Sequence, residues 1–262
     1  MTSAFPAAGA IAAQGAASTV GPGVPASTPT ALAAHPAEAV PARHRAAGPA
    51  STAPANPTAR VKWLAASSSA RWLEQAIARP DLVLIDHAHC ERKAAGAALQ
   101  LMFRYPGDAP LAAVLSPIAR EELEHFEQVV GLLERRGLAL RPLPAPPYGA
   151  TLASQVRREE PARMLDSFLV AGLIEARSHE RMALLAAHSP DPQLRDLYAE
   201  LLASEARHFG AYWTLCEQRW PRESVVERLQ QLALAEELAL SGDLERADQV
   251  RMHSVGIQAS EP

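Results

Sequence analysis

The sequence has few of the features that mark secreted, membrane or β-rich proteins. It contains two cysteines, Cys90 and Cys216, among 262 residues and no Cys-x-x-Cys, which excludes a disulfide framework and a zinc ribbon. Aromatic residues make up 5% of the chain, and valine and isoleucine are sparse beside alanine and leucine, which disfavours a β-sandwich. No apolar run reaches the roughly 18 residues that a membrane-spanning helix needs. We therefore expect a helical, cytoplasmic protein without a membrane segment.

The N-terminal part of the chain also lacks the residues from which a core is built. Residues 1–60 contain 21 alanines and 9 of the 22 prolines, but one acid, Glu38, and three arginines. Because this segment shows no apolar periodicity, we predict that residues 1–60 form a disordered extension. Residues 61–262 carry a formal net charge of -6 and are enough for one sizeable core, so we predict a single domain there. This mild acidity gives no global sign of nucleic-acid binding, although it leaves room for a local basic face.

Prolines and glycines divide residues 61–262 into helical segments. Four long helices are predicted, from Pro80 to Pro106, from Ala109 to Gly137, from Pro161 to His188 and from Pro192 to Pro221. Shorter helices are predicted near residues 68–78 and 222–240. A proline-rich link over residues 142–149 separates the second and third long helices and is long enough to cross the end of a bundle. This pattern predicts an all-α fold, a ferritin-like four-helix bundle with short flanking helices.

Each long helix has an inward-facing stripe that is apolar or small except near its middle, where a glutamate interrupts it. The four glutamates are Glu91, Glu122, Glu175 and Glu205, and the second and fourth are each followed three residues later by a histidine, His125 and His208. Residues three apart are neighbours on one helix face, so each Glu-x-x-His pair can bind one centre. The glutamates are 31 residues apart in the first helix pair and 30 in the second, which places the ligands of both pairs at matching depth.

Four carboxylates on core stripes require positive charge nearby, because a lone buried carboxylate is costly and neighbouring carboxylates repel one another. No lysine or arginine lies on these stripes. Two divalent ions would balance the charge, and the constellation is the one used by di-iron and di-manganese carboxylate bundles. Mixed oxygen and nitrogen ligands favour iron or manganese over zinc or copper. The alternative is a set of solvated glutamate-rich faces whose stripe has been placed one position away from the true one.

Three polar residues near the predicted ligands are candidates for supporting roles. His179 lies one turn after Glu175 and could hydrogen-bond a ligand, line the substrate channel or bind a metal ion itself. Glu121 could orient a histidine, with a solvated side chain as the alternative. Tyr212 could take part in redox chemistry or contact the substrate, and its alternative is a place in the core.

At these residues the sequence closely resembles the MiaE family, the tRNA 2-methylthio-N6-isopentenyladenosine hydroxylases. The matching segments are residues 86–95, 116–126, 174–182 and 204–209, and the resemblance extends from about Trp63 to His253. It implies a non-haem di-iron monooxygenase that hydroxylates the isopentenyl group of the modified adenosine next to the tRNA anticodon. It also implies dioxygen as co-substrate and electrons from a reductase or ferredoxin. The implied iron ligands are Glu91, Glu122, His125, Glu175, Glu205 and His208, with Glu122 or Glu205 as candidate bridges.

A tRNA substrate would need cationic side chains around the mouth of the pocket to hold its phosphates. Arg141, Arg157 and Arg158, near helix ends and connections, are the candidates, and scattered solvated charges are the alternative interpretation. A tRNA enzyme can act as a monomer, so we expect one. A ferroxidase or iron-storage bundle, a metal-free helical interaction module and a di-manganese catalase share parts of the same pattern.

Overall fold

The computed structural model describes residues 61–242, 244 and 246–257. Within them the secondary structure is helical, apart from one isolated bridge between Ser68 and Ile257. The α-helices of this part are α1 (Ala70–Ala78), α2 (Pro80–Arg104), α3 (Ala109–Arg135), α4 (Tyr148–Ser154), α5 (Ala162–His188), α6 (Pro192–Glu217) and α7 (Arg222–Leu240). The predicted disorder of residues 1–60 concerns residues outside the described part.

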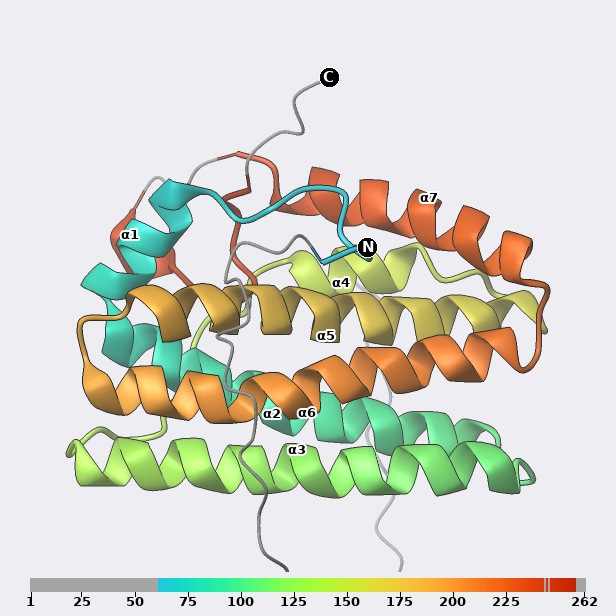
Figure 1. The fold of residues 1–262 in the computed structure, drawn as a ribbon, viewed down its shortest axis with the longest axis horizontal. Coiled ribbons are helices and arrows are strands. Elements are labelled where there is room, and N and C mark those ends of the chain that lie inside the picture. The colour runs from blue at the N-terminus through green and yellow to red at the C-terminus, as the bar shows by residue number, and fades with distance from the viewer. Residues whose placement is uncertain (1–60, 243, 245, 258–262) are drawn as a thin grey trace, which may run out of the picture. The chain divides into compact units, whose positions relative to one another are not determined.

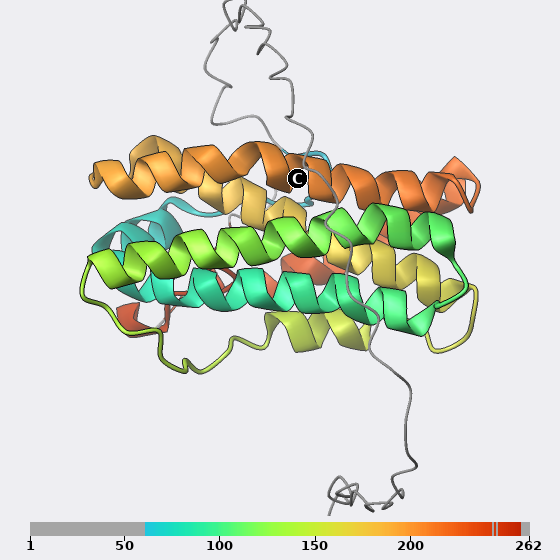
Figure 2. The same ribbon diagram turned by 90° about the horizontal axis from the view of Figure 1, so that it is seen from below.

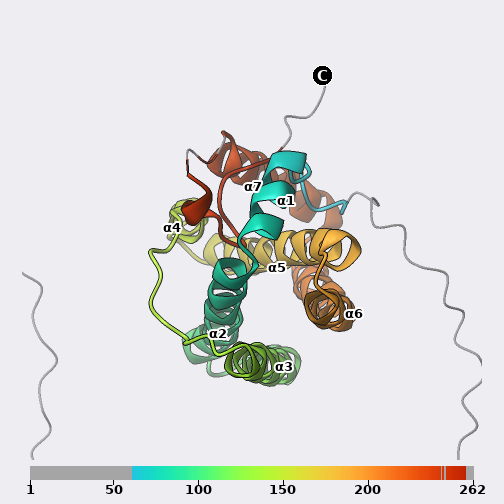
Figure 3. The same ribbon diagram turned by 90° about the vertical axis from the view of Figure 1, so that its left-hand side faces the viewer.

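Helices α2, α3, α5 and α6 form a four-helix bundle (Figure 1). Helix α2 packs along α3, and α5 packs along α6. The link over residues 136–147 runs outside α2 before it enters α4 (Figure 2). Seen along the bundle axis, α1, α4 and α7 lie together on one side, against α5 (Figure 3). The long crossover after the second bundle helix makes the arrangement ferritin-like, which confirms the predicted fold class.

Local capping chemistry explains why the predicted helix boundaries are confirmed to within a few residues. The carboxylate of Asp108 accepts a hydrogen bond from the backbone N–H of Leu111 at 2.9 Å, at the start of α3. Asp191 caps α6 in the same way, accepting from the N–H of Gln193 at 2.9 Å. Helix α3 ends where Gly137 adopts a φ of 68°, a left-handed conformation that costs glycine little.

Two features of the described part were not predicted. Helix α4 begins at the end of the proline-rich link, and its Tyr148 and Leu152 are buried. The segment 250–255 near the C-terminus is also mostly buried, because Arg181 on α5 donates hydrogen bonds to the carbonyl oxygens of Met252, at 2.6 Å, and Ser254, at 2.9 Å. Both segments are too short to show a hydrophobic period, so tertiary contacts determine their positions.

The apolar core has two halves. One half includes Leu115 and Phe168, and the other includes Leu84 and Leu132. On each bundle helix the glutamate of the inward stripe lies near the boundary between the two halves. A polar layer therefore crosses the middle of the bundle. Among the helices of the described part, none has the length and hydrophobicity of a membrane span.

Candidate metal centre

Six buried side chains from the four bundle helices meet in the polar layer. Each of them is 6% exposed or less. Their possible ligand atoms form two groups, and within each group the atoms lie within 4.8 Å of one another. The first group is Glu91, Glu122, His125 and Glu205, and the second is Glu122, Glu175, Glu205 and His208. The structure thus brings together all six residues that the sequence singled out as ligands.

Glu122 and Glu205 belong to both groups. Because each carboxylate has two oxygens, each of these residues can contact two ions at once. The other ligands divide evenly between two adjacent positions. Position A is completed by Glu91 and His125, and position B by Glu175 and His208.

Both imidazole rings turn Nδ1 toward the carboxylates. His125 Nδ1 lies 3.4 Å from Glu91 Oε2 and 3.6 Å from Glu205 Oε1. His208 Nδ1 lies 2.6 Å from Glu122 Oε1. Each Glu-x-x-His pair therefore contributes its histidine through the same ring nitrogen.

The outward-facing nitrogen of each ring is also hydrogen-bonded. His125 Nε2 is bonded to Ser204 Oγ at 3.0 Å, and His208 Nε2 is bonded to Glu121 Oε2 at 3.0 Å. Such outer contacts fix the orientation and tautomer of a metal-binding histidine. Glu121 also accepts a hydrogen bond from Arg207 at 3.0 Å. The structure places Glu121 where the sequence suggested a residue that orients a histidine.

Crowding among the carboxyl groups alters their pKa values. Burial raises the pKa of Glu175 and of Glu205 well above the usual range, and the nearby Glu122 and Glu91 raise both further. Burial would lower the pKa of His125, but its contacts with the carboxylates of Glu122 and Glu91 raise the pKa to about 10. The cluster therefore takes up positive charge, as protons or as metal cations.

Several inward-facing atoms of the cluster contact one another as ion pairs but make no well-aligned hydrogen bond among the described residues. They are Glu91 Oε2, Glu122 Oε1, His125 Nδ1, Glu205 Oε1 and His208 Nδ1. Converging buried carboxylate oxygens and imidazole nitrogens whose close contacts are mainly with one another favour a shared cation between them. Divalent ions would pair with them, and a donor set of carboxylate oxygens and imidazole nitrogens suits iron or manganese. The residues fit a two-metal centre.

The other two sequence candidates near the ligands lie outside both ligand groups. His179 is half-buried, and its Nδ1–H donates a hydrogen bond to the carbonyl oxygen of Leu202 at 3.1 Å. Tyr212 is 1% exposed, and burial followed by the charges of Glu175 and Glu122 raises the pKa of its phenol well above the usual value. Tyr212 is therefore a neutral hydroxyl beside the carboxylates.

His87 also contacts the cluster, although it was not predicted from the sequence to do so. This residue is fully buried, and its Nε2 is in ion-pair contact with Glu91 Oε1. Its ring packs against Tyr198 with the ring centroids 5.4 Å apart. Its Nδ1 has no hydrogen-bond partner in the described part of the chain. The spacing of four residues between His87 and Glu91 places both on one face of α2, which is the signal that could have revealed the contact.

A cavity of about 420 Å³ leads from the four glutamates outward between α2 and α5. Tyr148 of α4 and His253, both buried, also line it, with their rings stacked at a centroid distance of 4.8 Å. Burial, and then the charges of Arg181 and Arg177, lower the pKa of His253 to about 3, so this imidazole is neutral. The apolar residues that line the cavity are mostly small: Ala94, Ala97, Ala145, Pro146, Ala150, Ala171 and the larger Ile174.

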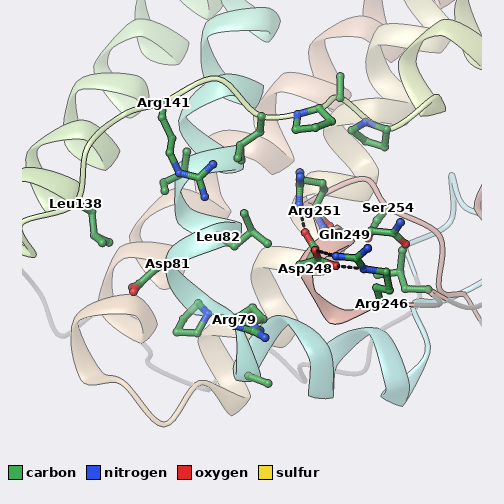
Figure 4. A pocket seen from close by; sticks show the side chains of 18 of the residues that line it. Arg79, Asp81, Leu82, Leu138, Arg141, Arg246, Asp248, Gln249, Arg251 and Ser254 are labelled. Atoms are coloured by element: carbon green, nitrogen blue, oxygen red, sulfur yellow. Dashed lines mark hydrogen bonds and ion pairs between the residues drawn. The ribbon is translucent and has the colours of Figure 1, made fainter.

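A larger cavity of about 1030 Å³ lies along the crossover link and shares Ala145 and Pro146 with the smaller one. Figure 4 shows Arg79 and Arg141 on different sides of it and the pair of Arg246 with Asp248 on a third. Of the three arginines that the sequence suggested for tRNA contact, Arg141 is thus the one that lines a cavity.

Arg157 and Arg158 line neither of these two cavities. The Arg157 guanidinium donates two hydrogen bonds to Asp166, at 2.9 and 2.7 Å. Arg158 is exposed. Replacing Arg157 would therefore alter an internal contact of the fold as well as a surface charge, and Arg158 is the cleaner test of this surface.

Comparison with known proteins gives a consistent family assignment. Residues 56–254 match the model of the MiaE family, described as tRNA-(MS2IO6A)-hydroxylase. A Pseudomonas putida protein named tRNA 2-(methylsulfanyl)-N(6)-isopentenyladenosine(37) hydroxylase is 42% identical over 184 residues, which cover 70% of this chain and 87% of that protein. A Salmonella typhimurium protein of the same name is 35% identical over 144 residues, which cover 55% of this chain and 51% of that protein.

One similar solved structure has a different description. It is Protein 43 with aldehyde deformylating oxygenase activity, from Synechococcus. Its sequence is 69% identical, its TM-score is 0.76, and the match covers 77% of this chain and 100% of that chain. The similarity supports the ferritin-like fold and adds an oxygenase to the relatives of this chain.

Proposed function

This chain belongs to the MiaE family, and we propose that it hydroxylates the isopentenyl group of 2-methylthio-N6-isopentenyladenosine next to the anticodon of tRNA. It is then an oxidoreductase, a tRNA-modifying monooxygenase. The observation that carries the proposal is the coincidence of this family match with six buried carboxylate and imidazole side chains around one centre.

We assign two iron ions as the cofactor, in positions A and B. Bound there, they would supply the electrons with which dioxygen is activated. Glu122 and Glu205 would hold both ions, while His125 and His208 would each bind one through Nδ1. The apolar walls of the bundle keep water away from the reaction.

The cavity of about 420 Å³ is the proposed place for the isopentenyl group. Its lining is mostly small and apolar next to the glutamates, which suits a branched hydrocarbon that must lie against the metal ions. Larger side chains at Ala97 or Ala171 would fill this space. We place the purine next to the polar and neutral side chains of Tyr148 and His253, which line the same cavity.

The larger cavity is the proposed place for the tRNA backbone, because it adjoins the substrate cavity and is lined by arginines (Figure 4). Arg79 and Arg141 are exposed and line this cavity, so we propose that their guanidinium groups bind phosphates, although Asp81 and Asp248 line the same cavity and lower its net positive charge. Base-specific contacts would come from stacking of the splayed nucleotide, as is usual for RNA loops.

Hydroxylation with dioxygen needs two electrons per turnover, so we propose a reductase or ferredoxin as electron donor. We also propose that the enzyme works as a monomer in the cytoplasm, where its tRNA substrate is found. None of the relatives reported above is described as an iron-storage protein. The storage interpretation therefore has no support from them.

A second candidate activity comes from the Synechococcus structure, whose description names an aldehyde deformylating oxygenase. The same apolar cavity next to the glutamates could hold the chain of an aliphatic aldehyde. The tRNA activity remains the first proposal, because the family model and both named relatives point to it.

Nucleoside mass spectrometry distinguishes the two candidates. We expect iron-loaded chain, supplied with a reductant and labelled dioxygen, to add one labelled oxygen atom to the isopentenyl adenosine of tRNA. Under the same conditions an aliphatic aldehyde should lose its formyl carbon slowly or not at all. Rapid deformylation without any tRNA product would favour the second candidate and contradict the first.

A strain that lacks this protein provides the matching test in cells. Its tRNA should retain the prenylated adenosine and lose the hydroxylated form. The hydroxylated nucleoside persisting in that strain, with no second enzyme present, would rule out the tRNA assignment.

A further inference from the structure

The two outer hydrogen bonds of the metal centre follow one pattern but use different partners. On each of α3 and α6, the residue just before the bridging glutamate contacts the histidine of the other helix. Glu121 on α3 contacts His208 on α6, and Ser204 on α6 contacts His125 on α3. The arrangement is reciprocal, so the chemistry of the partner is what distinguishes the two histidines.

A carboxylate partner makes His208 the stronger metal donor. When Nδ1 binds a metal ion, the ring proton is on Nε2 and is donated to the outer partner. Glu121 offers a charged acceptor, which polarises the imidazole more strongly than a neutral hydroxyl does. Ser204 is a neutral acceptor and itself donates a hydrogen bond to the carbonyl oxygen of Leu201 at 2.8 Å.

Arg207 does not cancel the charge of Glu121. Its guanidinium contacts Glu121 Oε2 at 3.0 Å, but its side chain is 61% exposed. Solvent therefore screens this pair strongly. His208, by contrast, is 2% exposed, and its contact with the partly exposed Glu121 carboxylate is partly buried, so solvent screens it less than the contact with Arg207.

The glutamates that complete the two positions differ as well. In position A, Glu91 is in contact with the buried His87, which competes with a metal ion for the charge of that carboxylate. In position B, Glu175 has no ion-pair partner among the described residues. Both differences act in the same direction, because they strengthen the ligands of position B and weaken those of position A.

We propose that the two metal positions are unequal, with position B binding its ion more tightly than position A, and that Glu121 and His87 are the positioning residues that set this difference. The inference rests on the proposed two-iron centre. Outer contacts of this type typically change metal affinity about 10–100-fold, which is enough to separate two binding steps. Position A would then lose its iron first.

Graded removal of iron from the loaded full-length chain tests this proposal. The chain is loaded with ferrous iron-57 under anaerobic conditions and challenged with increasing chelator, while iron content and the Mössbauer spectrum are followed. We expect two unequal iron signals and two release steps, with an intermediate that retains about one iron ion per chain. The signal that survives in the intermediate belongs to position B.

Two substitutions should change the iron affinities of the two release steps in different ways. Glu121→Gln keeps an oxygen acceptor but removes the charge, so we expect the tighter step to weaken about 10–100-fold and to approach the weaker one. His87→Leu removes the contact with Glu91, so we expect position A, the weaker position, to bind its iron ion more tightly. Glu124→Gln is the matched control, because it removes an exposed carboxylate from the same helix, and it should leave both steps unchanged.

The possible failures are distinguishable. A wild-type chain that releases both ions in one step, with a single iron signal, would overturn the inference and leave the two-iron centre intact. A Glu121→Gln chain in which only the weaker step changes would overturn the assignment of position B as the tighter one. A chain that binds no iron at all would overturn the proposed centre itself.

Discussion

Among the individual residues, the buried carboxyl and imidazole groups determine both the stability and the chemistry of this protein. The centre of the bundle holds four carboxyl groups and two imidazoles, each at most 6% exposed. Such a cluster is unfavourable for a helical core unless cations neutralise it. The same residues that reduce the stability of the metal-free chain are therefore the ones that give the loaded chain its chemistry.

The first prediction concerns the pH dependence of stability in the chain stripped of metal. The pKa values of Glu175, Glu205 and His125 are raised in the folded state, the last to about 10. Between the ordinary pKa values of these groups and the raised ones, the folded chain holds more protons than the unfolded chain. Stability must then fall as pH rises. We expect the unfolding temperature of the stripped chain to decrease from pH 6 to pH 9.

The loaded chain is the control for this prediction. Metal ions replace the protons on the same groups, so its unfolding temperature should change much less over that range. Thermal unfolding followed by circular dichroism measures both. A stripped chain that becomes more stable with rising pH would show that these groups are not perturbed in the way that the structure indicates.

The six proposed ligands could be predicted from the sequence, whereas the contacts of Ser204 and His87 with those ligands were not predicted. A glutamate that interrupts an apolar stripe is conspicuous, because a carboxylate is costly to bury unless a cation or a hydrogen bond compensates it. Ser204 gave no such signal, since a small hydroxyl is tolerated on either face of a helix. His87 lies on the same face of α2 as Glu91, one turn earlier, so this spacing of four residues was the signal available for it in the sequence.

At the scale of the element, one close approach fixes how the N-terminal segment of the described part meets helix α5. Gly172 on α5 lies directly beneath the indole of Trp63. A Cβ at position 172 would lie 2.4 Å from Cζ3 and 2.6 Å from Cη2 of that ring. Glycine is therefore required here by packing, one turn before Glu175.

The second prediction follows from this contact. Gly172→Ala must displace the Trp63 ring, so we expect it to lower the free energy of unfolding by about 1–3 kcal/mol, as overpacking usually does. Gly96→Ala on α2 is the matched control, because nothing lies within 4 Å of its added methyl group. It should raise stability by about 0.5–1 kcal/mol, since alanine is the better helix former. Chemical denaturation of both variants gives the two values, and equal effects would refute the packing argument.

The long helices were predictable because each carries its own start and stop signals. Pro80 and Asp191 mark helix starts, and Gly137 marks an end, without help from the rest of the chain. Helix α4 and segment 250–255 have no such signals. Their places depend on partners far away in the sequence, such as Arg181 for the carbonyl of Met252.

At the scale of the whole molecule, the two cavities are arranged as neighbours along the crossover link. They share Ala145 and Pro146, so a nucleotide in the smaller cavity would have its backbone next to the larger one. The link is thus well placed to contact both parts of a tRNA substrate.

The third prediction concerns this arrangement. Arg79→Ala combined with Arg141→Ala should weaken tRNA binding. The steepness of the plot of log binding constant against log salt concentration should fall by about two, because each lost phosphate contact removes roughly one released counterion. Iron content should not change. Filter binding at several salt concentrations measures the slope. Arg158→Ala provides the comparison, and a loss of affinity there equal to that of the double variant would place the tRNA elsewhere.

The fourth prediction concerns the N-terminal extension. The family match begins at residue 56, and residues 1–60 contain little that could join a core. We expect a chain that starts at residue 56 to bind iron and to unfold at the same temperature as the full chain. A lower unfolding temperature in the shortened chain would show that the extension contributes to the fold.

If six buried side chains hold two iron ions in the middle of the bundle, the iron content of purified chain depends on Glu205, a ligand shared by both positions. Iron is therefore measured in the wild-type chain and in the Glu205→Ala variant. We expect about two iron ions per wild-type chain and a loss of both in the variant. Equal iron content in the two proteins, or a wild-type chain without any bound iron after anaerobic loading, would contradict the two-iron centre.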